Sequence, residues 1–150
     1  MNTQEALTTD ANTLTKLTLR SKSYWGYSEA QIEKWVEELT ITKKYIEENQ
    51  IFKLVVDDQL VGFYAFGTES ETAVKLNYLF VEPKYIGKGY GKILIVDCID
   101  RIRTAGYIRI TLDADPNAEK FYSKNGFKVI GKLKSSIKDR YLPIMEMKLD

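Results

Sequence analysis

The 150-residue sequence contains no histidine, one cysteine and three prolines. Without histidine there is no catalytic Ser-His or Cys-His pair and the commonest metal ligand is missing, so we expect no metal site. The single cysteine, Cys98, supports neither a disulfide framework nor a Cys-based zinc site, and we interpret it as a small buried side chain. Any proton transfer must therefore use Tyr, Asp, Glu, Lys or water.

The sequence also lacks an excess of either charge and any long apolar run. Lys plus Arg number 22 and Asp plus Glu number 21, so we expect no nucleic-acid partner. The polar start, Met1 to Glu5, has no apolar signal region and no run reaches membrane-spanning length, which predicts a cytoplasmic protein without a membrane partner. The length and the 44% hydrophobic content predict one globular domain over residues 1–150.

Alternating glycines at Gly87 to Gly91 join a β-type run to a helical run. The run Val74 to Val81 is rich in β-branched and aromatic residues, and Pro83 predicts that the strand stops just before it. The apolar residues that follow predict a helix that ends before Gly106. A glycine loop at a helix N-terminus exposes backbone N–H groups, which favours a pyrophosphate ligand.

The spacing of this loop disfavours two common nucleotide ligands. A dinucleotide fingerprint requires Gly or Ala three residues after Gly89, where Lys92 stands. A nucleoside-triphosphate loop requires Gly where Ile86 stands, and Ser or Thr where Ile93 stands. NAD and ATP are therefore disfavoured, and a glycine-rich turn without any ligand stays open as an alternative.

The order of predicted elements indicates an α/β protein. Three helices are expected early in the chain from their N-cap residues, which are Asp10, Ser28 and Thr42. The other expected elements are strands at 5–7, 51–56, 60–66, 74–82, 108–112, 127–130 and 144–147, and helices at 93–105 and 116–125. The strands at 51–56 and 60–66 form an antiparallel hairpin, whereas the helix before 108–112 implies a parallel crossover. The fold class is therefore α/β with a mixed sheet.

Two motifs resemble the GNAT (Gcn5-related) N-acetyltransferase family. The stretch Ile86-Gly87-Lys88-Gly89-Tyr90-Gly91, preceded by Val81-Glu82-Pro83, is similar to the acyl-coenzyme A loop of that family. The family has Gln or Arg where Ile86 stands, so one side-chain contact differs. The second motif is Asn117, then Phe121-Tyr122, then Gly126-Phe127. The resemblance implies a central mixed β-sheet flanked by helices and acetyl-CoA as co-substrate.

The resemblance also implies which residues hold the coenzyme. They are Leu79, Phe80, Val81, Ile86, Gly87, Lys88, Gly89, Tyr90, Gly91, Lys92, Asn117 and Tyr122. In relatives the Asn contacts the pantetheine arm and the Tyr lies near the coenzyme sulfur, roles that fall here on Asn117 and Tyr122. Polarity at a helix start for Asn117 and core packing for Tyr122 are the alternatives.

The chemistry of acetyl transfer requires a neutral amine, a polarised thioester carbonyl and a proton for the departing thiolate. Tyr122 is the expected catalytic acid, because a tyrosine with a reference pKa near ~10 is protonated at neutral pH. Some relatives place a glutamate on the strand before the loop, but Lys75 occupies the aligned position. Three nearby carboxylates remain as candidates for the base, Glu82, Asp113 and Asp115. A chain of water molecules is the alternative.

The acceptor is expected to be a small-molecule or peptide amine. The aromatic residues Tyr24, Trp25 and Tyr27 concentrate between the first two predicted helices. Glu29, Glu33 and Glu37 repeat at i, i+4, i+8 on the second helix, and together with the aromatic residues they suit a cation. Core packing of the aromatic loop and a solvated acidic face are the alternatives. A homodimer is allowed but not required.

Two functions stay open at the level of sequence. The first is an acetyl-CoA-dependent N-acetyltransferase that works by direct transfer in a ternary complex, because neither Cys98 nor a Ser-His pair offers a covalent relay. The second is a non-catalytic acyl-coenzyme A sensor or interaction module of the same fold.

Overall fold

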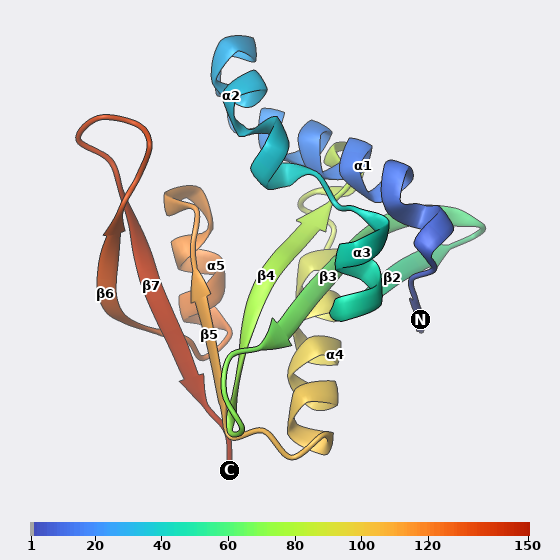
Figure 1. Ribbon diagram of the computed structural model, residues 1–150, viewed down its shortest axis with the longest axis vertical. Coiled ribbons are helices and arrows are strands. Elements are labelled where there is room, and N and C mark those ends of the chain that lie inside the picture. Colours follow the sequence, from blue (N-terminus) through green and yellow to red (C-terminus); the bar gives the residue numbers. More distant parts are fainter. Residues whose placement is uncertain (1) are drawn as a thin grey trace. The chain divides into compact units, whose positions relative to one another are not determined.

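Figure 1 shows the computed structural model, which describes residues 2–150. Its strands form a mixed seven-stranded sheet in the order β1-β2-β3-β4-β5-β7-β6. The helices are α1 (Ala11–Ser23), α2 (Glu29–Leu39), α3 (Lys43–Glu48), α4 (Tyr90–Thr104) and α5 (Glu119–Lys124). The strands are β1 (Thr3–Glu5), β2 (Gln50–Val56), β3 (Gln59–Thr68), β4 (Ala73–Val81), β5 (Arg109–Asp113), β6 (Lys128–Lys134) and β7 (Tyr141–Lys148). The predicted α/β class with a central mixed sheet and flanking helices is confirmed.

The described residues form two compact units, and each is described by itself. Unit 1 contains the residues up to Phe66 and Tyr78–Cys98, and unit 2 contains Gly67–Asn77 and Ile99–Asp150. Strand β4 and helix α4 contribute residues to both units. The single domain over residues 1–150 stays a prediction. Within residues 2–150, no helix has both the length and the apolar character needed to cross a membrane.

Unit 1 is organised around the β2–β3 hairpin, which confirms the predicted antiparallel pair. Its tight turn is Asp57-Asp58, with φ of 51° and 62°, a left-handed conformation that matches the twist of a hairpin. On one face of the hairpin, Phe63 packs in a buried cluster with Leu14 and Leu17 of α1. Residues 62 and 64 face the other side, toward α4. The hairpin therefore lies between α1 and the first part of α4.

The caps of the early helices are predicted correctly in two cases of three. The Ser28 hydroxyl accepts a hydrogen bond from the Gln31 N–H at 3.1 Å, and the Thr42 hydroxyl accepts one from the Tyr45 N–H at 3.0 Å. Asp10 precedes α1 as predicted, but its carboxylate accepts instead from the Leu7 N–H and from Lys53. The expected strand over residues 5–7 is also displaced, because β1 covers Thr3–Glu5 and a 3-10 turn occupies Thr8–Asp10.

Unit 2 contains the parallel pairing that the sequence predicts. Val74 of β4 is opposite Ile110 of β5, with both strands running the same way, and β5 and β6 each pair antiparallel with β7. Alternate residues of β5 have different surroundings: Ile110 and Leu112 are buried, whereas Arg109 and Asp113 are partly exposed. One face of this strand therefore packs in the core, and the other carries polar side chains.

The region after β5 differs from its prediction in one respect. We expected one helix from Pro116 to Asn125, but a 3-10 turn covers Pro116–Ala118 and α5 begins only at Glu119. The Asp115 side chain accepts from the Asn117 N–H, and the Ala118 N–H donates to the Asp115 carbonyl, which tightens this first turn. Ala118 thus lies in the 3-10 turn before α5 and not in the helix that carries Tyr122. Strands β6 and β7 also extend further than predicted.

A first prediction concerns the close approach of β3 to β4 in unit 1. A Cβ added at Gly62 would lie 2.6 Å from the Phe80 carbonyl oxygen and 2.9 Å from Leu94 Cδ1. Because a backbone oxygen cannot move aside easily, Gly62→Ala should lower the free energy of unfolding by about 1–3 kcal/mol in urea titrations. The control is Gly131→Ala in β6, where the nearest atom to the added Cβ is 3.7 Å away. Equal midpoints for the two variants would contradict this account.

Candidate functional site

The glycine loop connects β4 to α4 in unit 1. A 3-10 turn at Pro83–Tyr85 ends the strand, and Gly87 and Gly89 follow with φ of 84° and 86°. Other residues rarely adopt this left-handed conformation, so the loop requires glycine at both positions. No heavy atom lies within 4 Å of a Cβ built on either glycine, so the loop has open space beside it. The first turn of α4 begins directly afterwards, and its N–H groups are suited to an anion.

Basic and aromatic side chains surround this loop. The ammonium groups of Lys84 and Lys88 lie 5.1 Å and 5.8 Å from the centre of the Tyr85 ring, and that ring meets Tyr90 edge-on at 5.8 Å. The lysines are exposed. Lys88 and Tyr90 are among the residues that the sequence predicts to hold the coenzyme, and that assignment stays a prediction. Lys84 and Tyr85 were not among them, although basic residues that flank a glycine loop favour a phosphate ligand.

Burial and backbone hydrogen bonds hold the residues between the end of β4 and the glycine loop. Leu79, Phe80 and Val81 are partly buried at the end of β4. The Glu82 N–H donates to the Val61 carbonyl at 2.8 Å, which holds the strand end against β3. The Ile86 N–H donates to the Pro83 carbonyl. This amide therefore closes the 3-10 turn, and the predicted cradle is left to the amides after Ile86.

A salt bridge that was not predicted from the sequence fixes the residue at the start of the loop. Arg20 of α1 donates from Nε and Nη2 to the two carboxylate oxygens of Glu82, at 2.7 Å and 2.8 Å. These hydrogen bonds raise the pKa of the Arg20 guanidinium. The Glu82 side chain is only 15% exposed, so it is not a solvated strand end. The two residues are 62 positions apart, and no local pattern signals their contact.

The residues predicted to bind the acceptor divide into two groups in unit 1. Tyr24 and Trp25 are exposed just after α1, and their rings meet edge-on at 5.2 Å. Tyr27 instead packs edge-on against the buried Trp35 of α2 at 4.8 Å. The ammonium of Lys22 lies 5.4 Å from the Tyr27 ring and 5.1 Å from the Trp35 ring. A cation of the chain itself thus already occupies this aromatic pair.

Glu33 lies on the exposed side of α2 with Glu29 and Glu37. This placement agrees with both a solvated acidic face and a surface that attracts cations. The acceptor assignment of Glu33 and of the aromatic residues therefore stays a prediction.

Unit 2 contains the two residues of the second motif. Asn117 donates from its backbone N–H and its side-chain amide to one oxygen of Asp115, at 2.9 Å and 3.0 Å. Tyr122 is only 8% exposed, and its ring packs edge-on against Phe121 and Phe127 at 5.2 Å and 5.6 Å. Asn117 is thus oriented by the turn before α5, and Tyr122 is held by aromatic packing.

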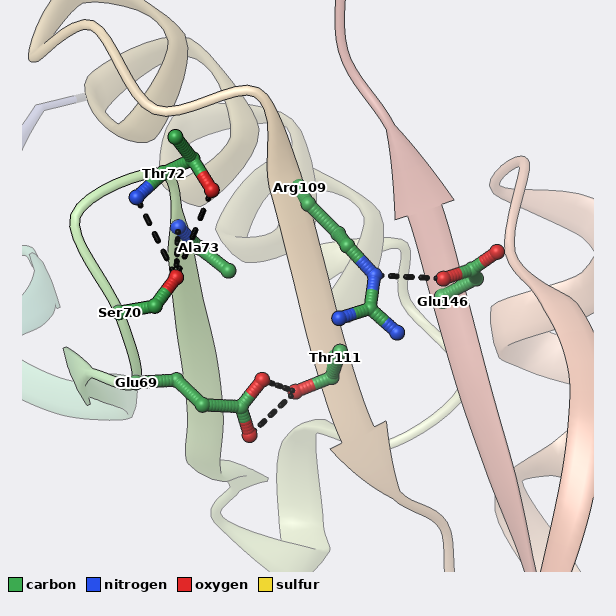
Figure 2. A network of polar contacts seen from close by, with 7 residues as sticks. All are labelled: Glu69, Ser70, Thr72, Ala73, Arg109, Thr111 and Glu146. Atoms are coloured by element: carbon green, nitrogen blue, oxygen red, sulfur yellow. Dashed lines mark hydrogen bonds and ion pairs between the residues drawn. The ribbon is translucent and has the colours of Figure 1, made fainter.

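A row of polar groups occupies the polar face of β5 and its neighbours in unit 2 (Figure 2). The Thr111 hydroxyl donates to Glu69, with both carboxylate oxygens at 3.1 Å. Arg109 donates to Glu146 of β7 at 2.6 Å. Further along the same face, Lys75 of β4 donates to Asp113 at 2.9 Å. Lys75, which stands where some relatives have glutamate, is therefore half of an ion pair.

Cys98 does not offer a nucleophile. Its side chain is fully buried in α4. Burial raises the pKa of the Cys98 thiol, because the charged thiolate is disfavoured in an apolar surrounding. This confirms the interpretation of Cys98 as a small buried side chain.

Comparison with known proteins gives a consistent result. A model of the acetyltransferase (GNAT) domain matches residues 25–150. The chain is 32% identical, over 77 residues, to an uncharacterized N-acetyltransferase, ycf52, of Pyropia yezoensis; the match covers 51% of this chain and 44% of that protein. It is 40% identical over 48 residues to glucosamine 6-phosphate N-acetyltransferase of Trypanosoma brucei brucei, which covers 32% of this chain and 33% of that protein. The chain thus matches less than half the length of either relative.

Its fold is similar to a crystal structure of PaiA N-acetyltransferase from Thermoplasma acidophilum in complex with coenzyme A. The TM-score is 0.78 with 24% sequence identity, and the match covers 99% of each chain. This likeness supports the architecture described above for the whole length of the chain.

A second prediction tests the glycine loop. Gly89→Val should abolish binding of coenzyme A, because a β-branched residue disfavours the left-handed backbone that the loop requires and adds bulk beside the exposed amides. Isothermal titration calorimetry measures the affinity. The control is Gly106→Val, since Gly106 also has a positive φ, 94°, and open space around it, but lies after α4. Coenzyme binding by folded Gly89→Val at the parental affinity would exclude the loop as the site.

Proposed function

Because the chain belongs to the GNAT acetyltransferase family, whose domain model matches residues 25–150, we propose that it transfers the acetyl group of acetyl-CoA to a primary amine. GNAT enzymes use acetyl-CoA as co-substrate. The observation that carries the proposal is the open loop with left-handed Gly87 and Gly89 between β4 and α4. The amides after Ile86 and the exposed Lys88 and Lys92 would hold the pyrophosphate, and the carboxyl end of β4, Leu79 to Val81, would offer backbone groups to pantetheine.

The proposed transfer is direct, within a ternary complex. The amine nitrogen attacks the thioester carbonyl carbon, the C–N bond forms, and the C–S bond breaks to release the coenzyme thiolate. A covalent acetyl-enzyme is disfavoured because Cys98 is buried and the chain has no histidine. Asn117, oriented by Asp115, would contact the pantetheine arm, and Tyr122 would give its proton to the thiolate.

A third prediction tests Tyr122. General-acid catalysis contributes typically ~10²–10⁴-fold, so Tyr122→Phe should lower kcat by about that factor. The affinity for acetyl-CoA should stay nearly unchanged, because the ring and its packing against Phe127 remain. Stopped assays with a thiol reagent measure kcat, and calorimetry measures affinity. A matched control is Tyr107→Phe, since Tyr107 lies in the loop after α4 and its hydroxyl is 3.3 Å from that of Thr68. If Tyr122→Phe keeps kcat within about threefold of the parent where chemistry limits the rate, Tyr122 is a packing residue.

The proposed acceptor is a primary amine of a small molecule or a peptide. Both curated relatives are named as N-acetyltransferases, which supports an amine as the acceptor. Only the Trypanosoma relative is named for a particular amine, an amino sugar phosphate, so the names do not define one class of amine. In this chain the exposed Tyr24 and Trp25 and the acidic face around Glu33 support an acceptor that is cationic before it reacts.

A fourth prediction follows for the acceptor. Glu33→Lys should raise KM for a diamine several-fold and leave the affinity for acetyl-CoA unchanged, because it reverses one exposed charge on the acidic face of α2 and leaves the glycine loop as it is. The effect should weaken in high salt, as expected for an exposed charge. Glu47→Lys on α3 is the control, since it makes the same charge reversal outside the acidic face of α2. If only neutral or anionic amines are acetylated, the cationic part of the proposal is wrong.

A non-catalytic acyl-coenzyme A sensor is the alternative function. Both functions predict that acetyl-CoA, but not ATP or NAD, raises the melting temperature of the protein. Only an enzyme releases free thiol from acetyl-CoA in a panel of amines. Thermal shift followed by this panel therefore separates the two.

A further inference from the structure

The three carboxylates left open as bases differ in what their oxygens already contact. Both oxygens of Glu82 accept from Arg20. In Asp115, one oxygen accepts from Asn117 and the other pairs with Arg140 at 3.3 Å. In Asp113, Oδ2 accepts from Lys75 at 2.9 Å, whereas Oδ1 has no partner among residues 2–150. Asp113 is thus the one of these three with an oxygen still available to accept a proton.

Asp113 also lies at a suitable point in the fold. It is the last residue of β5, which runs parallel to β4 in unit 2. The carboxyl ends of parallel strands are the edge at which α/β sheets bind ligands. The turn that orients Asn117 follows only a few residues later in the chain. The side chain of Asp113 is 26% exposed and that of Lys75 is 41% exposed, so a small substrate can reach the pair.

We propose that Asp113 is the proton acceptor for the amine, and that Lys75 is the residue that positions it. This inference rests on the proposed acetyltransferase function. A carboxylate that one lysine holds by a single oxygen keeps a fixed direction while its second oxygen stays open to the substrate. An ion pair between partly exposed groups adds little to stability, so orientation is the better explanation for this pair.

The proton balance of the step is complete. When the amine nitrogen forms its bond to the carbonyl carbon it becomes positively charged, and its proton passes to Oδ1 of Asp113, directly or through one water. The carbonyl double bond then re-forms, the C–S bond breaks, and the thiolate takes the proton of Tyr122. Asp113 afterwards returns its proton to solvent and Tyr122 regains one. Neutral amine and acetyl-CoA thus give an amide and free coenzyme A. An amine that arrives as a cation first loses one proton to solvent before it attacks.

The structure explains how a lysine is accommodated where some relatives carry glutamate. Lys75 is opposite Thr111 in the parallel ladder, so Asp113 is two residues further along β5 on the same face. Lys75 reaches across to the carboxylate on the neighbouring strand. Two other charged groups on this face have partners of their own, Glu69 with Thr111 and Arg109 with Glu146 (Figure 2).

A fifth prediction tests the carboxylate. Asp113→Asn should lower kcat by about 10²–10⁴-fold, the usual contribution of a general base, with unchanged KM and affinity for acetyl-CoA. Its amide oxygen can still accept from Lys75, so the melting temperature should change little. Asp113→Glu should recover part of the lost rate. The control is Glu69→Gln, a carboxylate on the same face bonded to Thr111, which should keep the parental kcat. Parental turnover by Asp113→Asn would overturn the proposal.

The positioning role of Lys75 is tested in the same assays with two further variants. One removes the lysine, and the other exchanges the lysine and the carboxylate between the two strands. Lys75→Met should lower kcat about tenfold or more without changing KM for acetyl-CoA, because the carboxylate loses its direction. The double variant Lys75→Glu with Asp113→Lys restores a carboxylate and a lysine on the same two strands. It should be more active than Asp113→Lys alone, and equal activity of the two would overturn the assignment. A parent protein that binds acetyl-CoA but acetylates no amine would contradict the proposed function instead, before any variant is compared.

Discussion

The parallel pairing of β4 with β5 is the constraint on which the rest of the structure depends. Parallel neighbours cannot be joined by a tight turn, so the chain must leave the end of β4 and return along a crossover. Helix α4 is that crossover, and residues 82–89 are all that separates it from the strand. The chain must therefore reverse within a few residues, and left-handed Gly87 and Gly89 provide the reversal. The open loop before α4, which we propose as the pyrophosphate site, is a consequence of this sharp connection.

Ion pairs and hydrogen bonds occupy the oxygens of two of the three carboxylates considered as bases. Glu82 is committed by both of its oxygens to Arg20, and Asp115 orients Asn117 while it pairs with Arg140. These two acidic side chains shape the loop and the turn before α5, and their oxygens are occupied. Among these candidates, only the carboxylate on the polar face of unit 2 keeps an oxygen unoccupied. The ion pairs and hydrogen bonds of the folded chain therefore distinguish acidic residues that the sequence alone does not separate.

The parts predicted correctly from sequence depend on neighbouring residues. The Asp57-Asp58 hairpin turn, the cap at Ser28 and the glycine loop are each encoded within a few positions. The helix start after β5 was placed less well, because Asp115 competes for its N–H groups and favours a 3-10 turn. The contact of Lys75 with Asp113, 38 positions apart, was beyond prediction because the sequence offers many other acidic partners. Family resemblance identified Lys75 as unusual, and the structure supplies its partner and a reason why a lysine is tolerated there.

The position of Lys22 affects where a cationic acceptor could bind among the aromatic residues. A cation over the faces of Tyr27 and Trp35 uses the attraction that those rings offer, and a second cation there would meet the charge of the first. The exposed rings of Tyr24 and Trp25 carry no such occupant among the described residues. An amine approaching as a cation would therefore be drawn to Tyr24, Trp25 and the acidic face of α2, whereas an anionic group on the acceptor would favour Lys22. If the acceptor binds at this aromatic cluster as proposed, its charge would determine which of the two ring pairs it meets first.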